Sequence, residues 1–305
     1  MKKIIIFYAS YGGGHLSAAK SIKNYIDTNF DNVETELIDC IYSISKPINK
    51  ITTSAYKFLA KNAPNLWGII YNNSQKGFLG KFSNLTNRYL ASKLYKLLIE
   101  KKPDVIITTH PFGSQMTSYL KEKQKLNCVL STVLTDFAPH DQWLVGHKFV
   151  NYFFVAHEKM KYQLIDSGIE ENKIIVSGIP VSSRFLQNYN NSEIFKSFNL
   201  NENKKTVLFF GGGEFGLGKK KTLTIFKFLS ENTNKYQIVA ISGRNKKMKS
   251  KFESLINENN KNDIRIYEYT NQVPELMNIC KLVITKPGGL TSTESLASRT
   301  SNDYN

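Results

Sequence analysis

Short apolar runs alternate with longer amphipathic stretches along the whole chain of 305 residues. The runs have the length of buried strands, and stretches of helical length separate most of them. We predict strands over 3–8, 34–39, 104–108, 128–134, 151–155 and 173–176, and in the second half over 206–210, 236–242, 264–267 and 282–285. Strands that alternate with helices form parallel sheets covered on both faces, so the sequence predicts an α/β protein.

The α/β pattern starts afresh in the second half of the chain. The segment QNYNNSEIFKSFNLNENKK, residues 187–205, is polar and rich in asparagine, and a new strand and glycine turn follow it. Polar segments of this kind are typical of domain boundaries. We therefore expect two Rossmann-like domains, 1–186 and 187–305, that face one cleft.

A glycine turn with a histidine behind it follows the first strand, in FYASYGGGHLSAAKSI (7–22). Glycine turns between a strand and a helix commonly hold a phosphate. A dinucleotide site is one interpretation, since Asp39 ends the next strand. The dinucleotide-binding motif has a third glycine or alanine where this chain has Ser17, and pyrophosphate binding gives no role to His15.

A second glycine turn lies in VLFFGGGEFGLGKKKTL, residues 207–223. It approaches the phosphate loop of nucleotide hydrolases, but Lys220 stands where the magnesium-binding hydroxyl would be. Three glycines at a strand end still allow close backbone approach to an anion. The alternative is that they only form a tight turn.

The third glycine turn, in LVITKPGGLTSTESLA (282–297), places hydroxyl groups at the expected start of a helix. Hydroxyls and free amides at that place favour a phosphate. Glu294, expected in the first helical turn, can accept hydrogen bonds from two vicinal hydroxyls such as those of a ribose. The alternative is a capping box in which Thr291 and Glu294 cap the helix.

The charge balance favours anionic partners. Lys and Arg number 41 against 25 Asp and Glu, a formal net charge of +16. Anionic lipid, phosphate-bearing substrates and nucleic acid are the candidates, although a basic bias spread over the surface would give the same sum. No nucleic-acid-binding motif is present, so we expect no nucleic-acid partner. Three widely spaced cysteines predict reduced thiols in a cytosolic protein.

Residues 44–99 alternate apolar and basic positions at helical spacing and then add aromatic residues. The residues concerned are Ile44, Ile48, Ile51, Ala55, Phe58 and Leu59, then Lys46, Lys50, Lys57 and Lys61, and then Trp67, Tyr71, Phe78 and Phe82. Such a surface suits docking on an anionic bilayer, while a core-facing helix followed by a loop is the alternative.

Five segments stand in order along the chain: YGGGHLSAA (11–19), TDFAPHDQW (135–143), SGIPVSSRF (177–185), FGGGEFG (210–216) and TKPGGLTSTESLA (285–297). Together they resemble the GT-B glycosyltransferases that build glycolipids. The nearest group is the monogalactosyldiacylglycerol synthases and processive diacylglycerol glucosyltransferases, which are related to the lipid-II N-acetylglucosaminyltransferases. The resemblance implies inverting transfer of glucose or galactose from a UDP-sugar to diacylglycerol, by a peripheral enzyme on the cytoplasmic face of the membrane.

The resemblance also assigns residues to the donor. The diphosphate and ribose would lie on the third glycine turn, the uracil near the end of the strand over 264–267, and the second glycine turn would lie across the cleft. The donor residues implied are Gly212, Gly213, Glu214, Thr270, Gly289, Leu290, Thr291, Glu294 and Arg184. Helix amides can stabilise a leaving diphosphate, and the sequence has no DxD pair, so we expect neither a metal nor a cofactor.

His15 is the expected catalytic base, because an imidazole titrates near neutrality and can accept the proton of an attacking hydroxyl. Asp136 is the rival base, or it orients a histidine. The resemblance places Gly13, Gly14, His140 and Trp143 on the acceptor side.

Relatives continue beyond the TESLA segment with a further strand, a donor loop and C-terminal helices, where this chain has SRTSNDYN. We therefore expect an incomplete second domain. Two alternatives stay open: transfer of N-acetylglucosamine to a polyprenyl-linked acceptor, and a UDP-sugar- or lipid-binding form without catalysis.

Overall fold

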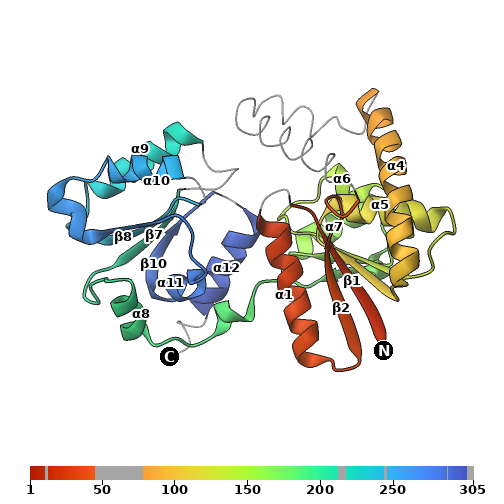
Figure 1. The fold of residues 1–305 in the computed structure, drawn as a ribbon, viewed down its shortest axis with the longest axis horizontal. Coiled ribbons are helices and arrows are strands. Elements are labelled where there is room, and N and C mark those ends of the chain that lie inside the picture. The colour runs from red at the N-terminus through yellow and green to blue at the C-terminus, as the bar shows by residue number, and fades with distance from the viewer. Residues whose placement is uncertain (11–12, 45–77, 212–217, 244–245, 287, 301–305) are drawn as a thin grey trace. The chain divides into compact units, whose positions relative to one another are not determined.

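The computed structural model describes residues 1–10, 13–44, 78–211, 218–243, 246–286 and 288–300. The chain divides into two compact units, Met1–Val181 and Ser182–Asn305 (Figure 1). The sequence placed the boundary at residue 186. Residues Ser183–Leu186 form a 3-10 turn, η3, that packs on two helices of the second unit, and this packing assigns the turn to that unit.

The first unit contains a six-stranded parallel sheet in the order β2-β1-β3-β4-β5-β6. Its strands are β1 (Lys2–Tyr8), β2 (Val33–Asp39), β3 (Val105–Thr108), β4 (Val129–Val133), β5 (Tyr152–Val155) and β6 (Ile174–Val176). Its helices are α1 (Gly13–Asn29), α4 (Phe78–Lys101), α5 (Pro111–Glu122), α6 (Asp141–Leu144) and α7 (Glu158–Asp166), with 3-10 turns η1 (His147–Phe149) and η2 (Glu171–Lys173).

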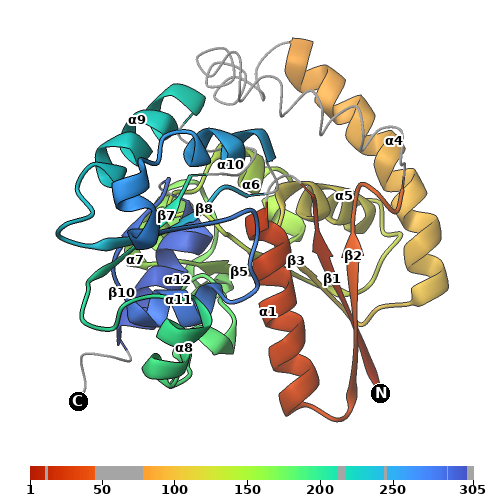
Figure 2. The ribbon, with the colours of Figure 1, turned by 60° about the vertical axis from the view of Figure 1, so that its left-hand side comes forward.

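Helices cover the first sheet through the apolar positions that the sequence pattern predicts. Helix α1 packs along β1 and β2, where Ala18 and Ala19 are fully buried (Figure 2). Helix α5 packs on β4 and on α4. Phe7, Met116 and Phe153 lie in the buried core that results.

The second unit contains a four-stranded parallel sheet in the order β10-β7-β8-β9. Its strands are β7 (Thr206–Phe210), β8 (Gln237–Ile241), β9 (Ile264–Tyr267) and β10 (Cys280–Ile284). Its helices are α8 (Asn191–Ser197), α9 (Lys219–Ser230), α10 (Lys246–Glu253), α11 (Val273–Ile279) and α12 (Gly289–Thr300), with the 3-10 turn η4 (Glu258–Asp263).

The two parallel sheets confirm the predicted α/β class. Each predicted strand is present, and its ends differ from the prediction by at most two residues. Cys40, Cys128 and Cys280 are buried free thiols, as predicted. In the part of the chain that the structure describes, no helix is long and apolar enough to cross a membrane.

The first glycine of the second glycine turn has a packing role. A Cβ atom on Gly211 would lie 2.3 Å from Phe252 and 2.7 Å from Phe209, which belong to a stacked aromatic core with Phe226. Glycine is therefore needed here for the close fit of backbone and rings.

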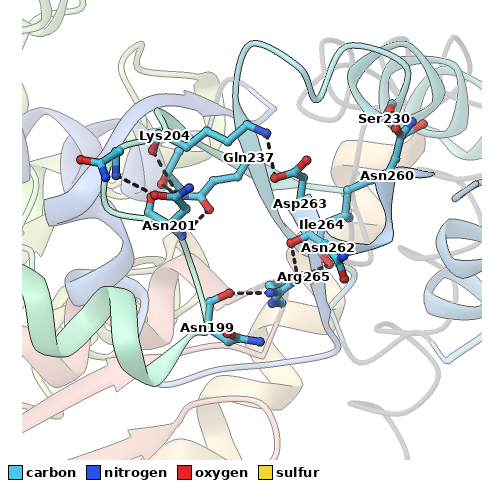
Figure 3. A network of polar contacts seen from close by, with 12 residues as sticks. Asn199, Asn201, Lys204, Ser230, Gln237, Asn260, Asn262, Asp263, Ile264 and Arg265 are labelled. Carbon is cyan, nitrogen blue, oxygen red and sulfur yellow. Dashed lines mark hydrogen bonds and ion pairs between the residues drawn. The ribbon is translucent and has the colours of Figure 1, made fainter. Parts of the chain in front are cut away.

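A buried glutamine joins the segment before β7 to the second sheet (Figure 3). The Gln237 amide nitrogen donates to the carbonyl oxygens of Asn201 (2.8 Å) and Lys204 (3.1 Å) and to Thr206 Oγ1 (3.0 Å). Its amide oxygen accepts from the Asn201 N–H at 2.9 Å. The side chain thus ties the segment 201–204 to the buried Thr206 at the start of β7.

Replacing this glutamine by an isosteric apolar residue is expected to destabilise the second unit. Gln237→Leu removes the hydrogen bonds to Asn201, to Lys204 and to the buried Thr206 hydroxyl, which costs about 1–3 kcal/mol. Urea unfolding of the variant measures the loss. Asn232→Ala, which removes an exposed side-chain hydrogen bond on α9, is the control with a loss of about 0.5 kcal/mol or less. Equal stability of the Gln237 and Asn232 variants would contradict the prediction.

Candidate functional site

The polar residues of the first unit follow the carboxyl ends of its strands. Because the sheet is parallel, these ends share one edge. The strand order reverses between β1 and β3, and in open α/β sheets ligands bind at such a reversal. His15, which follows β1, and Thr109, which follows β3, flank this point.

His15 is held by residues from two other strand ends. Its ring Nδ1 lies 2.6 Å from the Thr109 carbonyl oxygen and 3.0 Å from Thr135 Oγ1. The Thr109 hydroxyl in turn donates to the His15 carbonyl at 2.9 Å. The ring of His110 packs edge-on against that of His15, with 4.6 Å between centroids.

These contacts assign the proton of the neutral His15 ring. A carbonyl oxygen only accepts, so Nδ1 carries the hydrogen and Nε2 keeps its lone pair. Burial lowers the pKa of His15, and the hydrogen bond to Thr109 offsets part of this effect. At neutral pH the ring is therefore uncharged and can accept a proton at Nε2.

His110 extends the same polar cluster into the core. Its Nδ1 accepts from the Phe112 N–H at 3.2 Å and so caps α5. Burial, aided by the nearby His15 and His140, places its pKa well below the usual range. A neutral His110 adds no positive charge beside His15. Sequence reasoning missed Thr109, His110 and Thr135, although polar residues directly after predicted strands in TTHPF and LTDF were the available signal.

Asp136 follows β4 and is held in place by the helix after it. Its Oδ2 accepts from Trp143 Nε1 at 3.1 Å and lies 3.6 Å from His140 Nε2. Burial raises the pKa of Asp136, but the contacts with His140 and Trp143 outweigh burial and leave it below its usual value. A carboxylate with a lowered pKa is a weak base.

Trp143 lies in the core of the first unit. The indole is fully buried and donates to Asp136, and its acceptor-side role stays a prediction. His140 is half-buried and precedes α6, next to the Trp143 ring at 5.8 Å. Its acceptor-side role stays a prediction.

Gly13 and Gly14 are the first residues of α1. A Cβ atom on Gly13 would have no neighbour within 4 Å, so packing does not demand glycine there. Backbone amides at a helix start suit close approach of a ligand, and the acceptor-side roles of Gly13 and Gly14 stay predictions.

Asp39 is used inside the first unit, which removes the support for a dinucleotide site. One oxygen accepts from the Ser10 hydroxyl at 2.5 Å. The other accepts from the backbone N–H groups of Ile41 (3.1 Å) and Tyr42 (2.9 Å). The carboxylate that would bind a ribose thus fixes the turn after β2.

The second unit repeats the arrangement at its own sheet edge. The order β10-β7-β8-β9 reverses between β7 and β10. The carboxyl ends of β7, before the second glycine turn, and of β10, before the third, flank the reversal. Gly212, Gly213 and Glu214 of the second turn lie outside the described residues.

The third turn leads directly into α12, which begins at Gly289. The N–H of Ser292 bonds back to the Gly288 carbonyl at 3.1 Å. The amides of Gly289, Leu290 and Thr291 therefore occupy the helical positions that have no acceptor within the helix. N–H groups at the positive end of a helix dipole suit a phosphate, and the donor roles of Gly289, Leu290 and Thr291 stay predictions.

This helix start differs from the one that the capping box considered as an alternative would give. Thr291 lies inside the first turn, so it is not the cap residue, and Glu294 lies in the second turn rather than the first. Glu294 is half-buried and stands three and four residues after Thr291 and Leu290, which places it on their face of the helix.

Thr270 and Arg184 both fix the loop between β9 and α11. The Thr270 hydroxyl accepts from the Gln272 N–H at 3.0 Å. The Arg184 guanidinium donates to the Asn271 carbonyl at 3.0 Å and to Glu275 Oε1 at 2.6 Å. Arg184 thus has a carboxylate partner, and the donor roles of Thr270 and Arg184 stay predictions.

The predicted membrane-docking lysines cannot be followed in the structure. Lys46, Lys50, Lys57 and Lys61 lie outside the described residues. Within the described residues, no group of three or more His, Cys, Asp or Glu could hold a metal ion.

Solved structures share this pair of parallel-sheet units. The chain superposes on Acinetobacter baumannii MurG with a TM-score of 0.60 at 11% identity, covering 98% of this chain and 76% of that one. It superposes on the UDP co-structure of Staphylococcus aureus MnaA with a TM-score of 0.60 at 13% identity, covering 95% and 75%. The two parallel-sheet units therefore have the fold of the GT-B class.

Sequence comparison gives the family. Residues 15–181 match the model of monogalactosyldiacylglycerol (MGDG) synthase, and residues 190–301 match glycosyl transferases group 1. A processive diacylglycerol beta-glucosyltransferase of S. aureus (strain MRSA252) is 32% identical over 306 residues, which cover 97% of this chain and 73% of that protein. The chain belongs to the monogalactosyldiacylglycerol synthase family of glycosyltransferases, as its motifs predicted.

Proposed function

We propose that the protein transfers a hexose, glucose or galactose, from a UDP-sugar to the hydroxyl group of diacylglycerol. The observation that carries this proposal is the neutral His15, whose Nε2 keeps its lone pair, in a chain of this family. The names of the relatives favour diacylglycerol over a polyprenyl-linked acceptor.

The proposed reaction is a single displacement. The acceptor hydroxyl oxygen attacks the anomeric carbon, the bond from that carbon to the diphosphate oxygen breaks, and UDP leaves with the electron pair. His15 Nε2 takes the proton of the hydroxyl as the new bond forms. Asp136, with its lowered pKa, stabilises the imidazolium that results.

The α12 amides would stabilise the charge on the leaving diphosphate. Oriented N–H groups act on developing negative charge without reorganisation, so this proposal requires no divalent cation. Glu294 would accept hydrogen bonds from the ribose hydroxyls. Because diacylglycerol resides in the bilayer, we propose a peripheral enzyme on the cytosolic face of the membrane.

The test is transfer of labelled sugar from UDP-glucose and from UDP-galactose to diacylglycerol in neutral detergent micelles, with the His15→Ala variant as the blank. Labelled glycolipid from one donor is the expected result and identifies the hexose. Transfer to a polyprenyl-linked acceptor but not to diacylglycerol, or UDP binding without transfer to either lipid, would overturn the proposal.

A further inference from the structure

Helices α9 and α10 of the second unit lie side by side (Figures 1 and 2). Residues of both helices, and residues that follow α10, line a groove. The groove has a volume of about 360 Å³ and is lined by Leu223, Thr224, Lys227, Lys251, Ser254 and Leu255. Its lining therefore combines an apolar base with two hydroxyls and two ammonium groups. None of these residues belongs to the donor or acceptor sites described above.

The two helices carry far more positive than negative charge. Helix α9 contains four lysines and no acidic residue, and α10 contains four lysines and one glutamate. That glutamate, Glu253, lies 3.9 Å from Lys249. Among the described residues, no carboxylate forms an ion pair with Lys219, Lys247 or Lys251.

Lysines from the two helices meet at the groove. Lys219 of α9 lies against Lys251 of α10, and this contact lowers the pKa of Lys251. Two neighbouring ammonium groups repel each other. An anion that binds between or beside them offsets this repulsion.

An aromatic side chain stands on the same exposed face of α9. Phe228 is 65% exposed and follows Thr224 by one helical turn, next to Lys227. An exposed aromatic ring beside clustered lysines and a small apolar groove is typical of a surface that lies on a bilayer, where the ring enters the interface and the lysines meet phosphates.

We propose that the α9–α10 groove and its lysines form a docking site for the phosphate headgroups of an anionic bilayer. The inference rests on the proposed function for its occupant, because an enzyme that acts on diacylglycerol must reach a membrane. It adds a site on the sugar-nucleotide side of the chain, whereas the predicted membrane surface over 44–99 belongs to the first unit.

The test compares binding of the full chain to phosphatidylcholine vesicles with and without phosphatidylglycerol, by co-sedimentation. The groove variant is Lys227→Gln, Lys247→Gln and Lys251→Gln. The control variant, Lys196→Gln, Lys205→Gln and Lys235→Gln, removes the same charge from exposed positions elsewhere in the same unit. We expect the groove variant to lose affinity for anionic vesicles at least about tenfold, since each basic residue near such a surface contributes severalfold.

The control variant should keep its affinity to within about threefold, and added salt should weaken binding by the wild type. Phe228→Ser should weaken vesicle binding without a change of charge. Equal binding by groove variant and wild type, or an equal loss in the control, would overturn the proposal. If inorganic phosphate abolished vesicle binding by the wild type, the groove would be a site for a free anion. If the groove variant lost RNA binding but kept vesicle binding, the groove would be a nucleic-acid site.

Sugar transfer in neutral micelles separates this inference from the proposed function. The groove variant should transfer sugar there at the wild-type rate, because no anionic surface is present. If the wild type fails to transfer sugar but binds anionic vesicles through the groove, the proposed function fails and the docking site stands.

Discussion

His15→Ala is expected to lower turnover by roughly 10²–10⁴-fold, the usual contribution of a positioned general base. The affinity for UDP should change little, because His15 lies in the first unit and its hydrogen bonds go to Thr109 and Thr135 of that unit. The measurements are single-turnover transfer to diacylglycerol in micelles and calorimetric titration with UDP. Loss of UDP binding together with turnover would assign His15 to the donor instead.

Asp136→Asn serves as the matched comparison for the choice of base. The asparagine keeps an acceptor for Trp143 Nε1 but removes the charge. If His15 is the base, this variant should lose less turnover than His15→Ala, about 10–100-fold, through loss of charge stabilisation. A larger loss in Asp136→Asn, with His15→Ala near wild type, would make Asp136 the base.

The pH profile gives an independent readout of His15. Its lowered pKa keeps the ring neutral, and therefore basic, to a pH below the ordinary histidine value of about 6.5. Turnover should hold from neutral pH down to that value and fall only below it, as Nε2 becomes protonated. Thr135→Val removes one contact of Nδ1 but leaves the Thr109 carbonyl, so turnover should be lower but should still fall only at low pH. A fall of turnover that begins above the ordinary histidine pKa would contradict this assignment.

Glu294→Ala is expected to weaken UDP binding about 10–100-fold, because charge-assisted hydrogen bonds to the ribose are lost. Glu294→Gln retains acceptor capacity without the charge and should fall between alanine and wild type. Leu296→Ala, at a position of the same helix that is 63% exposed, is the control for helix stability and should bind UDP normally. Unchanged affinity of Glu294→Ala would remove its ribose role, whatever the fate of the α12 amides.

The affinities for uridine, UMP and UDP separate the contribution of the α12 amides from that of the Glu294 carboxylate. The α12 amides act on phosphate, so the gain in affinity from uridine to UDP should be the same in Glu294→Ala as in the wild type. The loss caused by Glu294→Ala should already appear with uridine. If the loss instead appeared only with UDP, the carboxylate would act through the diphosphate turn.

The sequence by itself determined the strands, the parallel α/β class and the three glycine turns after β1, β7 and β10. Hydrophobic alternation is local, and buried strands must be apolar wherever they lie. The parallel class then places every strand-end loop at one edge of its own sheet. His15 and the α12 turn could therefore be identified as candidate sites without any distance.

Only the tertiary structure decided which polar groups are available for chemistry. The partners of His15 lie 94 and 120 residues away in sequence, and no local pattern encodes the Nδ1 proton that they fix. Asp39 had a local signal as a ribose ligand, yet its carboxylate accepts the backbone hydrogen bonds that fix the turn after β2. Trp143 and Arg184 have partners within their own units that the sequence did not indicate. The physical reason is that a buried donor or acceptor must find a partner, and folding brings together partners that are distant in sequence.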